Sequence, residues 1–115
     1  MTAAEDSARL RDGHYCQRCG RNIVDFPSSL HHRIPRQMGG SNSPAGLAVV
    51  DRASGLVRIC GTGTTGCHGT VESYRAEAYE TGWLVHRNED PSSIPLMRLD
   101  GSEFFLTDEG TVVEL

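Results

Sequence analysis

Four cysteines stand in two pairs, and their spacing indicates metal binding. Cys16 and Cys19 form a C-x-x-C pair, which lets two thiolates reach one ion, and Gly20 permits the tight turn that this requires. Cys60 and Cys67 form a second pair, whose Gly- and Thr-rich filler is flexible enough to bend both sulfurs inward. Four thiolates around Zn²⁺ leave no open position, so the sequence predicts a structural zinc site. Two disulfides or plain buried thiols are the alternative interpretations.

Three histidines and a glutamate could hold a second metal ion and act on a substrate. His31 and His32 are neighbours on an expected strand, where one could ligate a metal while the other acts as a base. His68 begins an expected helix, and Glu72 lies one helical turn later on the same face. A cation held by His31, His68 and Glu72 would keep open positions. Alternatively each histidine is structural, or His68 replaces Cys67 in a zinc site of three cysteines and one histidine.

Composition limits the class of protein. The 115 residues are 37% hydrophobic and 6% aromatic, which is thin for a core without a metal or disulfide, so we expect one small domain. No stretch approaches the roughly 18 apolar residues of a membrane-spanning helix, and the polar N-terminus lacks the apolar region of a secretory signal. We therefore expect a cytoplasmic protein without membrane contact, in which paired thiols favour metal over disulfides.

The net charge of −4 conceals an uneven distribution. All 11 basic residues are arginines, and residues 14–87, which hold every cysteine and histidine, carry a net charge of +3. Residues 88–115 carry a net charge of −6. The basic middle segment could bind a polyanion, because guanidinium groups match phosphate oxygens. The predicted phosphate contacts are the arginines Arg33, Arg36, Arg58 and Arg75. A solvated surface charge is the alternative for each of them.

Strands and a helix are expected to position these side chains. Residues 30–34 can form a short strand that a proline ends. Apolar runs at 47–50 and 56–60 predict a β-hairpin around a turn at 51–55. Apolar residues at helical spacing predict a helix over 68–79.

The chain is expected to divide into three segments. Residues 1–13 form an N-terminal arm that is either helical or disordered. Residues 14–87 contain all the candidate chemistry and form the main domain. Residues 88–115 form an acidic C-terminal β extension, in which three short apolar runs predict a hairpin or a small meander. Its charge would repel a polyanion, so we expect it to lie away from any surface that binds one.

The ordered motifs of residues 14–87 resemble the HNH endonucleases, especially small HNH proteins of bacteriophages that infect actinobacterial hosts. The resemblance is carried by Cys16-x-x-Cys19, Leu30-His31-His32-Arg33-Ile34-Pro35, Met38-Gly39-Gly40-Ser41 and Cys60…Cys67-His68-Gly69. It implies a small α+β architecture, the ββα-metal (HNH) fold, in which a β-hairpin and a following helix cradle one catalytic metal and a four-cysteine zinc braces them. A short C-terminal β-hairpin would extend that fold.

The resemblance also implies roles for individual residues. His31 takes the position of the first metal ligand, and His32 takes the position of the general base. His68 takes the second metal ligand on the helix. Glu72 falls where some relatives, such as the colicin nucleases, place another histidine ligand.

One motif departs from the family pattern. The middle asparagine of the family normally precedes an apolar residue that begins the second strand, and here Gly46 occupies that place. Asn42, four residues upstream, is the candidate for the same role, which is to tether the loop and orient the base.

The implied activity is hydrolysis of DNA phosphodiester bonds with one divalent cation, Mg²⁺, Mn²⁺ or Ni²⁺. DNA is the implied partner, and a phage terminase is a second one, because small phage HNH proteins are associated with genome packaging. The alternative is a zinc-stabilised module on the same fold that binds DNA or protein without cleaving.

Overall fold

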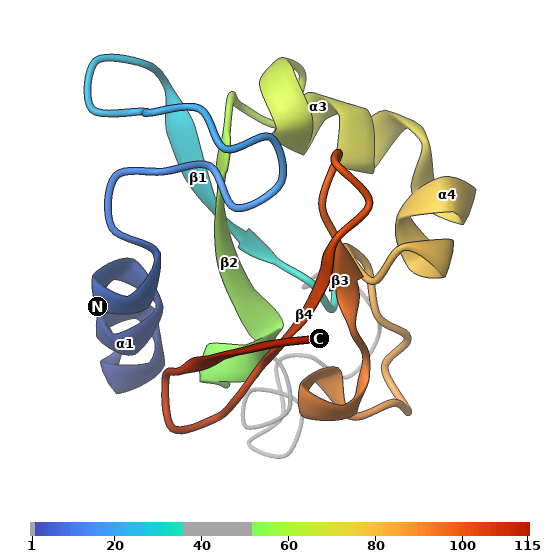
Figure 1. The fold of residues 1–115 in the computed structure, drawn as a ribbon. Coiled ribbons are helices and arrows are strands. Elements are labelled where there is room, and N and C mark those ends of the chain that lie inside the picture. The colour runs from blue at the N-terminus through green and yellow to red at the C-terminus, as the bar shows by residue number, and fades with distance from the viewer. Residues whose placement is uncertain (1, 36–51) are drawn as a thin grey trace.

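The chain is built around two small antiparallel sheets. The structure, a computed structural model, describes residues 2–35 and 52–115. Over these residues it contains two sheets and three α-helices, which is the small α+β architecture that the sequence predicts. In Figure 1 the N-terminal helix lies beside the first sheet, and the C-terminal strands cross in front of it.

The N-terminal segment is a helix that packs on the first sheet. Helix α1 (Ala3–Asp12) begins with a capping box, in which the side chains of Thr2 and Glu5 accept hydrogen bonds from each other's backbone N–H. At the other end Asp12 is buried, and its carboxylate accepts a 2.8 Å hydrogen bond from the backbone N–H of Arg58. Of the two alternatives for this arm, the structure therefore shows the helical one.

The first sheet pairs two strands that are distant in the sequence. Strand β1 (Ser28–His32) is antiparallel to β2 (Leu56–Cys60), and a 3₁₀ turn, η1 (Ala53–Gly55), immediately precedes β2. The strand expected over residues 30–34 therefore begins earlier and ends at His32. The other predicted strand, over residues 47–50, lies outside the described residues. The pairing that the structure shows for β2 joins it to the histidine-bearing strand.

Two short helices follow β2 where one was predicted. Helix α3 (Gly66–Ser73) and helix α4 (Arg75–Glu80) meet at Tyr74, whose backbone angles of φ −115° and ψ 64° are not helical. The single helix predicted over 68–79 is therefore wrong in its continuity, although most of these residues are helical. The break turns α4 away from the line of α3, as Figure 1 shows.

The C-terminal strands form the second sheet. Strands β3 (Leu96–Met97), β4 (Glu103–Leu106) and β5 (Val112–Glu114) are joined in that order by antiparallel pairing. A second 3₁₀ turn, η2 (Pro91–Ser93), leads into them. This sheet is the small meander that the three apolar runs predict.

The second sheet shares one hydrophobic core with the rest of the chain. Leu96, Phe104 and Leu106 are fully buried and belong to the cluster that also contains Trp83 and Val57. Residues 88–115 were expected to form an extension of the main domain. The structure shows instead that they contribute buried side chains to its hydrophobic core. No helix in the described part of the chain is long and apolar enough to span a membrane.

Candidate functional site

The four cysteines lie together, as their spacing predicts. Their sulfur atoms are within 4.8 Å of one another, and no disulfide joins them. The backbone N–H of Cys19 lies 3.5 Å from Cys16 Sγ, and the N–H of Cys67 lies 3.4 Å from Cys60 Sγ. Backbone N–H groups that donate to sulfur stabilise thiolates, which are the form that binds metal. The cluster could therefore hold a metal ion such as zinc.

The charge state of the cluster favours a cation. A hydrogen bond from the Cys67 thiol lowers the pKa of Cys16 to about 4, and the same contact raises the pKa of Cys67. Arg18 Nη1 lies 3.4 Å from Cys67 Sγ and offsets part of the negative charge. Arg18 was not singled out from the sequence, although its place inside the C-x-x-C pair is a signal that could have found it.

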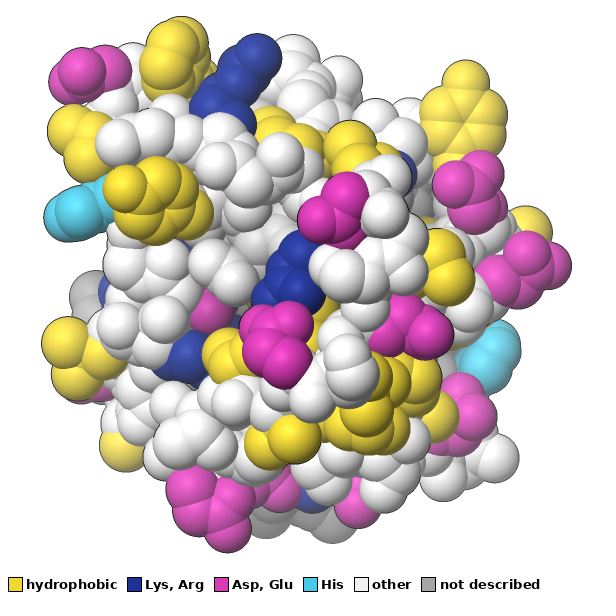
Figure 2. Space-filling model, in the orientation of Figure 1, with side chains coloured by type: hydrophobic (Ala, Val, Ile, Leu, Met, Phe, Trp, Pro, Cys, Tyr) yellow, Lys and Arg dark blue, Asp and Glu magenta, His cyan; other side chains and the backbone are white. Residues whose placement is uncertain are grey.

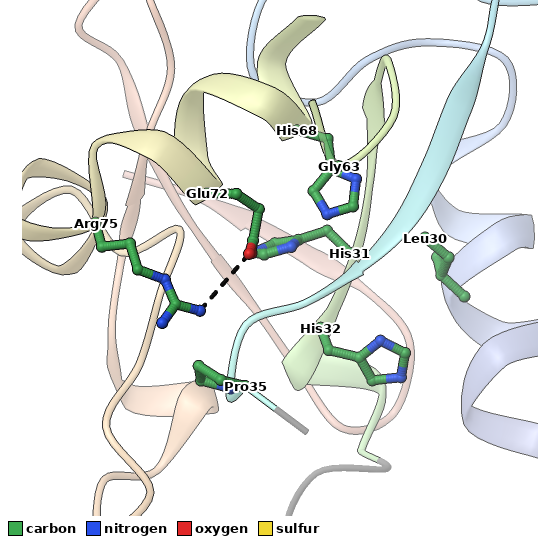
Figure 3. Close-up of a pocket in the computed structure, with 8 residues that line it drawn as sticks. All are labelled: Leu30, His31, His32, Pro35, Gly63, His68, Glu72 and Arg75. Atoms are coloured by element: carbon green, nitrogen blue, oxygen red, sulfur yellow. Dashed lines mark ion pairs between the residues drawn. The ribbon is translucent and has the colours of Figure 1, made fainter. Parts of the chain in front are cut away.

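A second group of possible metal ligands lies between β1 and α3. His31 comes from the strand, and His68 and Glu72 come from successive turns of the helix (Figure 3). The possible ligand atoms of these three residues are all within 4.8 Å of one another, and the two imidazole ring centres are 5.1 Å apart. The sulfur of Cys67 lies close to the other three thiols, whereas the ring of His68 lies close to His31 and Glu72. The geometry thus shows two separate groups, and not a shared zinc site that uses His68.

These three side chains border a cavity of about 260 Å³. His32, Pro35 and Arg75 also line it. In Figure 3 the ring of His32 lies apart from those of His31 and His68, because neighbouring residues of a strand point to opposite sides. His32 is nevertheless among the residues that line the cavity, although it is not one of the three possible ligands.

A single hydrogen bond sets the orientation of His31. Its Nε2 lies 2.7 Å from the backbone carbonyl oxygen of Trp83, and its side chain is buried. Because a carbonyl oxygen only accepts, Nε2 must carry the proton, and Nδ1 then keeps the lone pair that a metal needs. Burial lowers the pKa of His31 to about 3, so the ring is neutral at ordinary pH.

His68 has an incomplete set of partners. Its Nδ1 is buried and has no hydrogen-bond partner within the residues that the structure describes. Burial lowers the pKa of His68, and the negative charge of Glu72 offsets part of this shift. Two neutral imidazoles and one carboxylate are a donor set that suits a divalent cation. The residues present therefore fit a metal ion.

One of the four predicted phosphate contacts is wrong, and another makes internal hydrogen bonds. Arg33 has an exposed fraction of 0%, and its guanidinium group donates to backbone carbonyls, so it cannot reach DNA. Arg58 is half-buried, and its guanidinium donates to the Gly13 carbonyl at 2.9 Å and to Ser28 Oγ at 3.3 Å. Because the Arg58 side chain is only partly buried, its predicted phosphate contact stays a prediction.

Of the remaining predicted residues, Arg75 lies at the cavity. Its side chain is 42% exposed, and its Nη2 lies 3.6 Å from Glu72 Oε2, the ion pair drawn in Figure 3. Arg36 and Asn42 lie outside the described residues. Trp83, which holds His31, was missed because it acts through a backbone carbonyl, and no residue type signals that role.

No family model, curated protein or solved structure matches this chain. The interpretation of the site therefore depends on its geometry and on the chemistry of its residues. That geometry consists of a thiol cluster that could bind zinc and a separate His, His, Glu group that lines a cavity.

Proposed function

We propose that this chain is a metal-dependent DNA endonuclease of the HNH type. The observation that carries the proposal is the convergence of His31, His68 and Glu72 at a cavity, separate from the four cysteines. A closed thiol cluster serves structure, whereas a three-ligand site on a cavity leaves positions for substrate and water. The chain offers both kinds of site.

The order of elements around the cavity supports the ββα-metal interpretation. The antiparallel strands β1 and β2 are followed by α3, and the possible ligands come from the first strand and from the helix. Cys60 is the last residue of β2 and Cys67 is the second residue of α3, so a zinc ion at the thiol cluster would fix the end of the strand against the start of the helix. His68 follows Cys67 directly and would be held in place by the same bracing.

The cation site would be formed by the Nδ1 atom of His31, the ring of His68 and the carboxylate of Glu72. A bound Mg²⁺, Mn²⁺ or Ni²⁺ would stabilise the negative charge that develops on the phosphate oxygens and on the leaving 3′-oxygen. A phosphodiester needs this stabilisation, because its own charge repels nucleophiles and its alkoxide leaving group is poor.

His32 is the candidate general base. It lines the cavity beside the ligand group, and neutral imidazole accepts protons near neutral pH. In the proposed step a water oxygen attacks phosphorus and a water proton passes to His32. The bond between phosphorus and the 3′-oxygen breaks, and the 3′-oxygen leaves with the bonding electron pair and takes up a proton from solvent water. The products carry a 5′-phosphate and a 3′-hydroxyl group.

Binding of DNA would be weak and non-specific. Arg75, a predicted phosphate contact, lines the cavity, whereas the guanidinium groups of Arg33 and Arg58 donate to backbone carbonyls away from it. The face that carries the C-terminal sheet has many acidic side chains (Figure 2), so DNA would approach from another side. We propose that a partner supplies specificity, and the resemblance to small phage proteins makes a terminase the partner to test.

The burial of Arg33 removes one predicted phosphate contact, which favours a second candidate function, a zinc-stabilised binding module that does not cleave. One experiment separates the two. Purified, zinc-loaded protein is incubated with supercoiled plasmid in Mg²⁺, Mn²⁺ or Ni²⁺, beside His68→Ala and the control His86→Ala. His86 is exposed and stacks on Tyr79 outside the cavity.

The endonuclease proposal expects metal-dependent nicking that His86→Ala retains and His68→Ala loses. A folded, zinc-loaded protein that cuts with none of these ions, with or without a terminase large subunit, would support the binding module instead.

A further inference from the structure

Arg33 is a buried cation whose partners are all backbone carbonyls. Its Nε donates to the Gly82 oxygen at 2.9 Å, and its Nη1 donates to the oxygens of Ser54 at 2.7 Å and Pro91 at 3.0 Å. Its Nη2 donates to the Ile94 oxygen at 2.9 Å. These bonds join the end of β1 to η1, η2 and the segment that follows α4.

Burying a charged guanidinium group costs desolvation free energy, which a residue that only fills space would not require. Burial lowers the pKa of Arg33 to about 9, which still leaves the group charged at neutral pH. Its carbonyl partners satisfy four of the five N–H donors of the guanidinium, yet no carboxylate pairs with it among the described residues. An apolar side chain of similar size would avoid the cost of desolvation, so the bonds themselves indicate a specific role.

The bonds of Arg33 bracket the residue that holds His31. Its side chain binds the carbonyl of Gly82, and its own carbonyl accepts a 2.8 Å hydrogen bond from the N–H of Val85. Trp83 lies between these two points, and its carbonyl accepts the hydrogen bond from His31 Nε2. Gly82 adds a third constraint, because its φ of 84° and the close approach of the Pro95 carbonyl exclude any side chain there.

We propose that Arg33 is a positioning residue for the cation site, acting through the Trp83 carbonyl. By fixing residues 82–85 against the end of β1, it holds the acceptor that keeps the proton of His31 on Nε2 and leaves Nδ1 as the ligand. The Trp83 carbonyl is one hydrogen bond away from a candidate metal ligand, and partners in that position change metal affinity when they are displaced. The inference rests on the cation site of the proposed function.

The test measures metal affinity, independently of cleavage. Zinc-loaded protein is titrated with Co²⁺, and binding is followed by its visible absorption and by calorimetry. Arg33→Met is expected to bind Co²⁺ about 10-fold more weakly than the unchanged protein, with an altered absorption spectrum and the same zinc content. The matched control is Arg58→Met, which also removes a guanidinium bound to a carbonyl but has no bond to residues 82–94, and it is expected to match the unchanged protein.

Two further measurements test whether the guanidinium group of Arg33 itself is responsible for the change in Co²⁺ affinity. Millimolar guanidinium is expected to restore part of the affinity of Arg33→Met, by refilling the site of the missing group. Arg33→Lys retains the charge but lacks the planar fork, so it is expected to fall between Arg33→Met and the unchanged protein.

Three results would overturn the inference. Equal Co²⁺ affinity in Arg33→Met and the unchanged protein would show that Arg33 does not position the site. Failure of both Arg33 variants to fold would assign Arg33 to the fold alone. Absence of any Co²⁺ site beyond the thiol cluster in the unchanged protein would overturn the cation site of the proposed function as well.

Discussion

The Nε2 atom of His31 lies 2.7 Å from the carbonyl oxygen of Trp83, a residue 52 positions later in the chain. This one contact determines which ring nitrogen of His31 carries the proton and which keeps a lone pair. The candidate site therefore depends on the packing of the segment after α4 as much as on the strand and helix that carry its side chains.

Replacing His32 should affect the chemical step and leave cation binding intact. His32 borders the cavity but is not one of the three possible ligands, so His32→Ala removes only the proton acceptor. We expect cleavage to slow by about 10²- to 10⁴-fold while Co²⁺ affinity stays unchanged. Single-turnover cleavage and calorimetry measure the two quantities. If His32→Ala cleaved at the original rate, the base would have to be another residue.

Acid should destabilise the fold through His31. Its folded pKa is about 3, below the ordinary 6.5, so between these pH values the unfolded chain binds a proton that the folded chain does not. The free energy of unfolding must then fall as pH falls through this window, by at most about 1.4 kcal/mol per pH unit from this group. Urea denaturation at several pH values, without added second metal, measures the slope.

The matched variant for this titration is His31→Gln, whose amide can still donate to the Trp83 carbonyl but does not bind a proton. Its unfolding free energy should depend less steeply on pH between about 6.5 and 3 than that of the unchanged protein. Identical pH profiles for the two proteins would show that His31 is not desolvated.

Arg75 should contribute to DNA binding through charge alone. Its side chain is 42% exposed at the edge of the cavity, where a phosphate can reach it. In a His32→Ala background, Arg75→Ala should weaken binding to all DNA sequences alike and reduce the slope of log K against log salt by about 1. The control is Arg98→Ala, because Arg98 pairs with Glu114 in the acidic segment. Fluorescence anisotropy measures both, and an unchanged salt slope for Arg75→Ala would remove it from the interface.

The C-terminal sheet should be essential for stability. Phe104 is fully buried, with its ring centre 6.2 Å from that of Trp83, so Phe104→Ala should cost about 3–5 kcal/mol of unfolding free energy. Phe26 is 54% exposed, so Phe26→Ala, the control, should change it by no more than about 0.5 kcal/mol. Urea denaturation is the measurement. Equal, small effects of the two substitutions would mean that the sheet is peripheral.

Local spacing was sufficient for some parts of the site and not for others. The clustering of the four cysteines could be predicted, because a C-x-x-C turn and a flexible loop bring sulfurs together with little help from the rest of the fold. The meander of residues 96–114 could be predicted for a similar reason, since short turns join its strands.

The role of Arg33 could not be predicted, because arginine is rarely buried and its partners are carbonyls from three distant segments. The same holds for the pairing of β1 with β2, which depends on a contact between strands far apart in the chain. The break at Tyr74 also escaped prediction, since its apolar neighbours keep helical spacing across it.

The most direct test of the account compares cleavage with occupancy of the cation site. Mn²⁺ is titrated into zinc-loaded protein, and nicking of supercoiled plasmid is measured beside Mn²⁺ binding by calorimetry. The account predicts that half-maximal cleavage occurs at the measured Kd, and that Glu72→Gln shifts both to higher Mn²⁺ by the same factor. Cleavage that persists without Mn²⁺, or a filled site that produces no cleavage, would contradict it.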